Sequence, residues 1–267
     1  LPGVLPTDDA EHEAAHTLYS AQRAARETLD VALVIDTTGS MSDEISYLQL
    51  ELKSISKTIA TNHPDAAVRW ALVAYKDVGD SYVVQSSDFV DDVAGFGTDL
   101  NALSADGGGD FPEAPDAALA AATKLTWRTT NTTSRLVFWI ADAPHHRQNA
   151  KAMADAIRGA QALDVHVYPV ASSGVDEITE LTMRSAAQLT GGRYLFLTND
   201  SGIGGEHKEP TIPCYFVTRL DQAMLRMVDI ELTGTYREPD ASEIIRTSGE
   251  PKDGMCALQN GNAVAIF

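Results

Sequence analysis

The stretch VALVIDTTGSM, residues 31–41, decides the fold of this chain. A run of apolar residues leads into an acid, and three oxygen-bearing side chains then stand at alternate positions: Asp36, Thr38 and Ser40. A continuous apolar run of this length is typical of a strand that is covered on both faces of a parallel sheet. Alternate side chains in a strand and the loop that leaves it point the same way, so we expect the three oxygens to face one point.

Two kinds of chemistry fit an acid at this position. The motif DTTGS resembles the phosphorylated motif of P-type ATPases and, more loosely, that of haloacid-dehalogenase-type phosphatases, in which the first aspartate attacks phosphate. Those enzymes also need Mg²⁺ and a basic residue beside the phosphate, yet Thr37 stands where P-type ATPases carry a lysine. No Gly-Asp-Gly motif follows in the sequence. Phosphoryl transfer with Asp36 as nucleophile is therefore the alternative hypothesis.

The second chemistry is metal binding by the three oxygens. Hydroxyls and carboxylates are hard donors, and they favour Mg²⁺, Mn²⁺ or Ca²⁺ over zinc. One loop cannot complete the shell of such an ion, so further donors must come from neighbouring strands. The apolar run RLVFWIAD ends on Asp142, and the glycine-rich stretch GGGD places Asp110 before a predicted helix.

Outward from the opening stretch, apolar runs of strand length alternate with helical patterns. Further strands are predicted at 66–75, 135–142, 165–170 and 193–197, with a hairpin strand at 81–85; helices are predicted over 45–59, after the glycine-rich loop, and over 147–162, 175–189 and 217–232. Alternation at roughly 30-residue spacing predicts an α/β fold with a doubly wound, mostly parallel sheet. We expect one antiparallel edge strand and helices on both faces. In such sheets, binding residues gather at the carboxyl ends of the strands.

The chain divides into three expected parts: an N-terminal lead-in helix (1–29), the α/β domain (30–232) and a short β-like tail packed on that domain (233–267). The two cysteines, Cys214 and Cys256, match no zinc pattern. They form either one disulfide, as suits an exported protein, or two free buried thiols. Export or a cell-surface location is favoured slightly over the cytoplasm, and we expect the end at Leu1 to be processed or trimmed.

Composition excludes some classes of function. The formal net charge is −18, with 20 basic and 38 acidic residues, which argues against a nucleic-acid surface. No apolar run approaches the roughly 20 residues that a membrane helix needs. The sequence also lacks a nucleophile elbow, a Walker loop and a dinucleotide fingerprint in the right context.

The motif order points to a known family. The residues from Asp36 to Met41, followed by GGGDFPE and ADAP, resemble the von Willebrand factor A domain and its metal-ion-dependent adhesion site. The family motif is Asp-x-Ser-x-Ser with a distant threonine and a distant aspartate. The resemblance covers about residues 30–197. The stretch from Ser201 to Tyr215 further suggests a bacterial subgroup.

The resemblance implies a magnesium site, or one for Mn²⁺ or Ca²⁺. Thr38 and Ser40 would ligate the ion through their hydroxyls, and Asp36 and Asp142 would contact it directly or through water. Asp110 stands where the family usually has threonine. Thr98, in GFGTDL, is the alternative donor for that position. A third carboxylate would make an acidic ligand less welcome at the ion.

The function that the resemblance implies is binding rather than catalysis. A vacant coordination position would accept a carboxylate from a protein partner, as in integrin-type members. The remaining alternative is a structural domain whose site is vestigial.

Several further side chains could border such a site. Asp77 and Asp80 flank a turn, where acids often cap the backbone. His145 and His146 follow Asp142 closely, but adjacent histidines on a loop cannot easily chelate one ion. The set Glu206, His207 and Glu209 has donors that suit a transition metal, without a fourth ligand at a recognised spacing.

Overall fold

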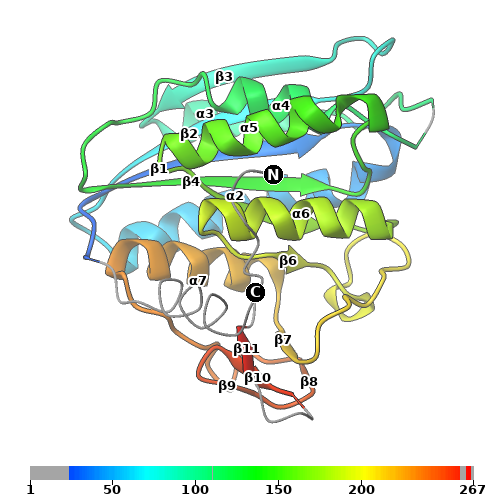
Figure 1. Cartoon of the computed structure of the whole chain (residues 1–267). Coiled ribbons are helices and arrows are strands. Elements are labelled where there is room, and N and C mark those ends of the chain that lie inside the picture. The colour runs from blue at the N-terminus through cyan, green and yellow to red at the C-terminus, as the bar shows by residue number, and fades with distance from the viewer. Residues whose placement is uncertain (1–23, 110, 259–262, 266–267) are drawn as a thin grey trace.

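The computed structural model describes residues 24–109, 111–258 and 263–265. Its main part is a six-stranded sheet between two layers of helices (Figure 1), with strand order β3-β2-β1-β4-β5-β6. The strands are β1 (Thr28–Asp36), β2 (Ala67–Tyr75), β3 (Val84–Val90), β4 (Thr133–Ala141), β5 (His166–Ala171) and β6 (Leu195–Phe196). All neighbouring pairs are parallel except β2 with β3, which confirms the predicted sheet with its antiparallel edge strand.

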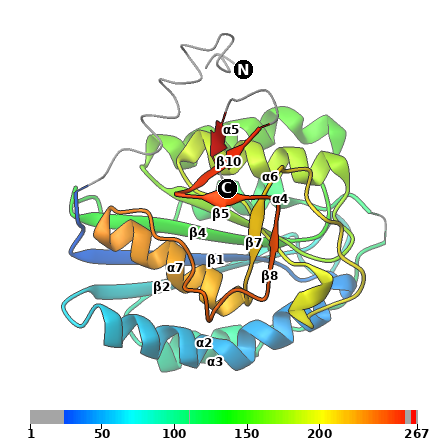
Figure 2. The same cartoon turned by 90° about the horizontal axis from the view of Figure 1, so that it is seen from below.

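Six helices cover the two faces of the sheet. They are α2 (Ser42–Asn62), α3 (Val93–Asn101), α4 (Pro115–Ala122), α5 (Ala150–Ala162), α6 (Glu177–Thr190) and α7 (Leu220–Thr233), with short 3₁₀ turns at Gly39–Met41, Arg147–Asn149 and Asn199–Ser201. Helices α2, α3 and α7 share one hydrophobic core with the sheet, and α4, α5 and α6 share the other (Figure 2). Within the described residues, no helix is long and apolar enough to cross a membrane.

Strand β1 lies at the centre of the sheet, and its apolar run explains this position. Leu33 and Ile35 belong to the core under α2, whereas Ala32 and Val34 belong to the opposite core. Because consecutive side chains of a strand point to opposite faces, a strand buried on both sides needs an unbroken apolar run. β1 pairs with β2 on one side and β4 on the other, so the ends of all three strands meet at one edge.

Most elements predicted from the sequence are confirmed, with three differences. The hairpin strand starts at Val84 rather than residue 81, after a longer turn. Helix α3 was not predicted, because Gly95 and Gly97 weaken its helical pattern; Asp92 caps it, accepting from the amides of Ala94 and Gly95. The lead-in helix is wrong for residues 24–29: residues 24–27 are irregular, and strand β1 begins at Thr28. The earlier residues of the predicted helix lie outside the described part.

The C-terminal tail packs beside the domain as a small β structure. Strand β7 (Tyr215–Val217) pairs with β8 (Arg246–Ser248), and β9 (Pro251–Lys252), β10 (Met255–Ala257) and β11 (Ala263–Ala265) form a second small sheet. A disulfide joins Cys214 to Cys256 across 42 positions, which settles the choice between bridge and free thiols. Closing a loop of that length stabilises a fold by about 4 kcal/mol on the chain-entropy model.

The start of β1 carries a buried charge cluster. Asp30 is fully buried and accepts hydrogen bonds from Arg69 at 2.6 and 2.9 Å. It also accepts from the Arg128 guanidinium and backbone amide, each at 2.8 Å. The carboxylate ties β1, β2 and the chain segment before β4 together at the edge of the sheet opposite to the end of β1.

We predict that Asp30→Ala lowers the free energy of unfolding by about 3–5 kcal/mol, because two arginines lose the acid that compensates their charge. Urea denaturation measures the change. The control Asp155→Ala removes an acid from the surface of α5, where Lys151 and Arg158 pair with it in solvent, and should cost less than about 1 kcal/mol. Equal effects of the two substitutions would contradict the role given to Asp30.

Candidate metal centre

The loop after β1 is shaped by the acid that ends the strand. Asp36 Oδ1 accepts hydrogen bonds from the Thr38 amide at 2.9 Å and from the Thr38 hydroxyl at 2.7 Å. This local pairing of an acid with the backbone two residues later is typical of an Asx turn. The other carboxylate oxygen, Oδ2, is buried without a hydrogen-bond partner.

The neighbouring strand β4 supplies a second acid to the same place. Asp142 follows the end of β4, and the Ser40 hydroxyl lies near enough to its carboxyl group to lower the pKa of that group. Asp142 Oδ1 is also buried without a hydrogen-bond partner. The structure therefore brings together four of the five predicted ligand residues: Asp36, Thr38, Ser40 and Asp142.

The electrostatics of the two acids favour a nearby cation. Burial raises the pKa of Asp36 to about 7, and the charge of Asp142 contributes to this rise. Burial likewise raises the pKa of Asp142, with a further contribution from the charge of Glu44. Burial thus disfavours the charged form of both carboxyl groups, and a divalent ion beside them would offset that cost and favour their ionised form.

Thr38, Ser40 and Asp142 line an open pocket of about 470 Å³, whereas the fully buried Asp36 is not among its lining residues. Its described lining residues are Thr38, Gly39, Ser40, Gly107, Gly108, Phe111, Glu113, Asp142, Ala143, Ser173, Gly174 and Glu206. The pocket opens at the carboxyl edge of the sheet, where binding sites of doubly wound folds are found.

Glu113 is a pocket residue that sequence reasoning missed. It is 3% exposed, its Oε2 has no hydrogen-bond partner, and its amide donates to the Pro144 carbonyl at 2.9 Å. Burial raises its pKa to about 9, and Asp36 adds the next largest contribution. The signal was present in GGGDFPE, but the helix was expected to begin near Asp110, whereas α4 begins at Pro115.

Asp110 and Thr98 were the two candidates for the fifth metal ligand, and the structure tests only Thr98. Asp110 lies outside the described residues, so its role stays a prediction. Thr98 is wrong as a ligand, because it sits in α3, where its hydroxyl donates to the Ala94 carbonyl at 3.1 Å. It does not line the pocket.

The candidate metal ligands are of two chemical types, hydroxyl oxygens and carboxylate oxygens. Across residues 24–109, 111–258 and 263–265, no group of three or more His, Cys, Asp or Glu side chains is arranged to hold a metal ion. A site here must therefore combine hydroxyl oxygens with the two acids. Such oxygen donors suit Mg²⁺, Mn²⁺ and Ca²⁺.

Lys76 holds the loop that contains Asp106 and Gly107 against the loop that follows β1. Lys76 is 1% exposed; its ammonium donates to the carbonyls of Thr37 and Asp106, and lies 3.1 Å from the Asp106 carboxylate. The Gly39 amide also donates to Gly107 at 3.2 Å. One wall of the pocket thus depends on contacts made by the residue that follows β2.

Two acids of the turn after β2, Asp77 and Asp80, make polar contacts with neighbouring loops. Asp80 accepts from the Gly108 amide at 3.2 Å, as expected of an acid that caps backbone. Asp77 pairs with His146 at 2.7 Å. His145 has a buried Nδ1 without a hydrogen-bond partner, and burial lowers its pKa.

The suggested transition-metal set does not converge. Glu206 is exposed at the pocket rim, while His207 is buried with neither ring nitrogen hydrogen-bonded. Glu209 pairs with Arg246 at 2.6 Å. In the part of the chain that the structure describes, these three side chains do not form a group that could hold a metal ion. Beside His207 lies the buried Glu44, whose charge acts on the histidine and whose Oε1 accepts from the Ser173 hydroxyl at 3.1 Å.

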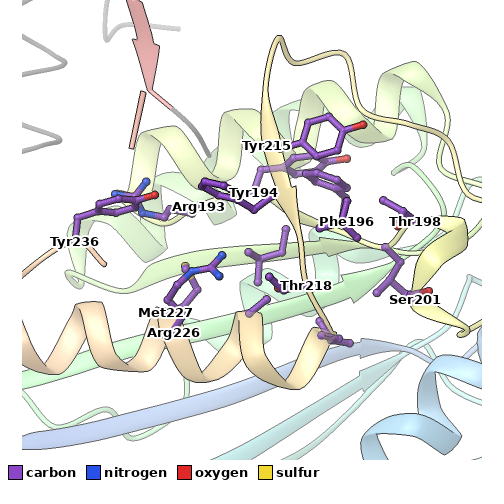
Figure 3. A pocket seen from close by; sticks show the side chains of 16 residues that line it. Arg193, Tyr194, Phe196, Thr198, Ser201, Tyr215, Thr218, Arg226, Met227 and Tyr236 are labelled. Atoms are coloured by element: carbon purple, nitrogen blue, oxygen red, sulfur yellow. The ribbon is translucent and has the colours of Figure 1, made fainter. Parts of the chain in front are cut away.

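A second, smaller cavity of about 60 Å³ lies among β6, β7 and α7 (Figure 3). It shares no lining residue with the pocket above the motif loop.

Comparison with known proteins agrees with this geometry. The sequence model of the von Willebrand factor A domain matches residues 30–202, which is more than half of the chain, so the chain belongs to that family. The class of protein that the fold and site define is therefore a von Willebrand factor A domain protein.

Two curated relatives match part of the chain. A putative ariadne-like RING finger protein of Acanthamoeba polyphaga mimivirus is 36% identical over 124 residues, or 46% of this chain and 12% of the relative. An alpha-protein kinase of Dictyostelium discoideum is 26% identical over 152 residues, or 57% of this chain and 24% of the relative. The chain thus spans less than a quarter of the length of each relative.

A solved structure shows the same fold. The conserved hypothetical protein BatB from Bacteroides thetaiotaomicron aligns with a TM-score of 0.50 over 76% of this chain and 97% of that one. The sequence identity is 12%, so this likeness concerns the fold alone.

We predict that Lys76→Met loosens the glycine-rich loop without unfolding the domain, because the methionine fills the space but donates no hydrogen bonds. The loss of a buried donor should cost about 1–3 kcal/mol of stability. Hydrogen exchange followed by mass spectrometry should show faster exchange in peptides that cover residues 104–109. The control Lys151→Met changes an exposed lysine on α5. Unchanged exchange at 104–109 in Lys76→Met would show that the lysine does not hold the loop.

Proposed function

We propose that this chain is a protein-interaction module that works through a divalent cation at the carboxyl edge of its sheet. The observation that carries the proposal is the meeting of two hydroxyls, Thr38 and Ser40, with two buried acids, Asp36 and Asp142. Each acid keeps one buried oxygen without a hydrogen-bond partner, although the Tyr75 hydroxyl lies near enough to Asp36 to lower its pKa. Buried polar atoms are nearly always paired, so these oxygens fit a ligand.

The chemistry of the donors supports Mg²⁺, with Mn²⁺ or Ca²⁺ as substitutes. Thr38 and Ser40 would offer hydroxyl oxygens, and the two acids would neutralise the charge of the ion. The bound ion would supply a Lewis-acidic centre that attracts an oxygen ligand. The chain's own residues would position that centre: Thr38 orients Asp36 through two hydrogen bonds, and Ser40 lies beside Asp142.

A binding role is favoured over phosphoryl transfer by the charge of the pocket. A phosphotransferase needs a basic residue to neutralise phosphate. None of the described residues that line the pocket is lysine or arginine. The nearby Lys76 is occupied by backbone carbonyls and Asp106. We therefore propose that the domain is not an enzyme.

The pocket rim supports a specific kind of partner contact. Glu113 and Glu206 line the pocket beside the proposed ion. Acids so close to the ion reduce its attraction for a further charge. A partner oxygen, from a carboxylate or a neutral group, would approach between them. The bacterial subgroup suggested by the sequence, and an extracytoplasmic location that would suit the disulfide, both stay predictions.

We predict that the full chain binds Mg²⁺ or Mn²⁺ in isothermal titration calorimetry, and that Ser40→Ala weakens binding at least about tenfold by removing a ligand. Asp36→Asn should have a larger effect, because it also removes a charge. Ser42→Ala is the matched control, since this exposed serine lies two residues beyond Ser40 at the start of α2. Binding that survives Asp36→Asn unchanged, or no binding by the wild type, would refute the site.

The open position can be tested separately. Mn²⁺ bound at a site with a free coordination position should strongly enhance water-proton relaxation, because its bound water exchanges with solvent. Acetate, as the simplest carboxylate probe, should lower that enhancement if a carboxylate can reach the ion. Strong Mn²⁺ binding without any enhancement would point to a closed structural ion instead of an interaction site.

A further inference from the structure

The smaller cavity has a composition unlike the rest of this acidic chain. Two arginines line it, Arg193 after α6 and Arg226 on α7, together with Tyr236 from the start of the tail (Figure 3). The arginines are close enough for each to act on the charge of the other. Two cationic groups thus share one space of about 60 Å³ in a protein whose net charge is −18.

Arg226 makes the cavity a candidate site. Its Nη1 atom is buried and has no hydrogen-bond partner. Within the described residues, Arg226 makes no ion pair. Burial lowers its pKa, which reflects the cost of keeping this charge out of water. A guanidinium has five donors that must be satisfied when they are buried, and leaving one without an acceptor is costly.

The acids nearest to this region are already engaged. Arg237 forms ion pairs with Asp229, at 3.2 Å, and with Asp240, at 2.9 Å. Glu243 lies 3.9 Å from the same arginine. On the other side, the Arg193 guanidinium lies over the Tyr236 ring, 4.7 Å from its centre. This contact orients Arg193. The charge of Glu243 acts on Arg226, but no carboxylate of the described residues forms an ion pair with it.

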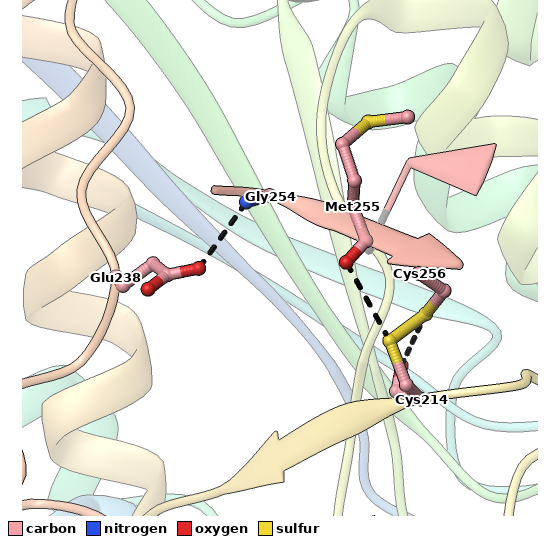
Figure 4. Close-up of a disulfide and its surroundings, with 5 residues drawn as sticks. All are labelled: Cys214, Glu238, Gly254, Met255 and Cys256. Carbon is pink, nitrogen blue, oxygen red and sulfur yellow. Dashed lines mark hydrogen bonds between the residues drawn. A yellow bond between two sulfur atoms is a disulfide. The ribbon is translucent and has the colours of Figure 1, made fainter. Parts of the chain in front are cut away.

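The walls of the cavity are held by the covalent and hydrogen-bonded structure of the tail. The disulfide joins Cys214, next to β7, to Cys256 (Figure 4). Glu238 accepts from the Gly254 amide at 3.3 Å. Because Tyr236 stands two residues before Glu238, these contacts keep the aromatic wall over Arg193. The cavity is therefore formed in advance of any ligand, which reduces the entropy cost of binding.

We propose that this cavity binds a compact oxyanion, a carboxylate or a phosphate, between Arg226 and Arg193. Guanidinium groups bind such anions through paired, charge-assisted hydrogen bonds. The anion would supply the acceptor that Arg226 Nη1 lacks. Thr198, Ser201 and Thr218 also line the cavity, but their hydroxyls already donate to Asp200 and to the carbonyls of Ile203 and Arg219, so the two guanidinium groups are the donors that the anion would use. The proposal does not depend on the metal centre.

The test is the melting temperature of the full chain during titration with sodium phosphate and, separately, with sodium acetate. Ionic strength is held constant with sodium chloride, and no divalent cation is present. At saturation, a specific anion should raise the melting temperature by about 2–4 °C, because it binds only the folded chain. A response to phosphate assigns a phosphate-type ligand, and a response to acetate alone assigns a carboxylate.

Arg226→Met should abolish the saturable rise without lowering the starting melting temperature, because an apolar side chain replaces an uncompensated buried charge. Arg158→Met, on the exposed face of α5, is the matched control and should keep the response. If Arg226→Met does not fold, Arg226→Lys serves instead, and its response should be weaker because lysine lacks the planar fork. The proposal is overturned if neither anion gives a saturable rise in the wild type, or if the rise persists at full size in these Arg226 variants.

Discussion

The Asp36 carboxylate, fully buried at the end of the central strand, is the constraint on which the candidate site depends. An acid in this place is tolerated because one of its oxygens is satisfied by two bonds from Thr38. Those bonds fix the turn that carries the chain from β1 into α2. The same turn places Ser40 against Asp142, so one local arrangement aligns donors from two neighbouring strands.

The loops around the candidate site all leave the sheet at the edge where β1, β2 and β4 end. β1, β2 and β4 end side by side. Asp36 is the last residue of β1, and Lys76 and Asp142 come directly after β2 and β4. Lys76 directs its charge away from the pocket, into carbonyls of two loops. The described lining of the pocket therefore has acids and no lysine or arginine, which favours the proposed cation binding over phosphate chemistry.

The sequence predicted correctly those strands and site residues that depend on hydrophobic periodicity and on local motifs. The apolar run before Asp36 located the central strand, and strand ends located Asp142, since the order of a doubly wound sheet brings such ends together. Helix α3 was missed because its two glycines weaken the pattern, although Phe96 and Leu100 are buried. The irregular residues just before β1 were predicted to be helical, because an alanine-rich composition has high helix propensity whether or not a helix forms.

The predicted site was less complete than the predicted fold. Glu113 is brought beside the pocket by the bond between its amide and Pro144, a tertiary contact without a sequence signature. Thr98 had the right chemistry but lies within a helix, where its hydroxyl bonds the preceding turn. The pair of Arg193 and Arg226 could not be foreseen either, because the two residues meet only through the packing of α7 and the tail.

The most direct measurement for the central claim is a crystal structure grown with Mn²⁺, in which the anomalous signal locates the ion. The account predicts a peak bounded by Asp36, Thr38, Ser40 and Asp142, with one coordination position open to the pocket. It would also show whether Glu113 or Asp110 takes part. A structure at saturating Mn²⁺ without a peak there, with the free oxygens of Asp36 and Asp142 bonded to protein groups or water, would contradict it.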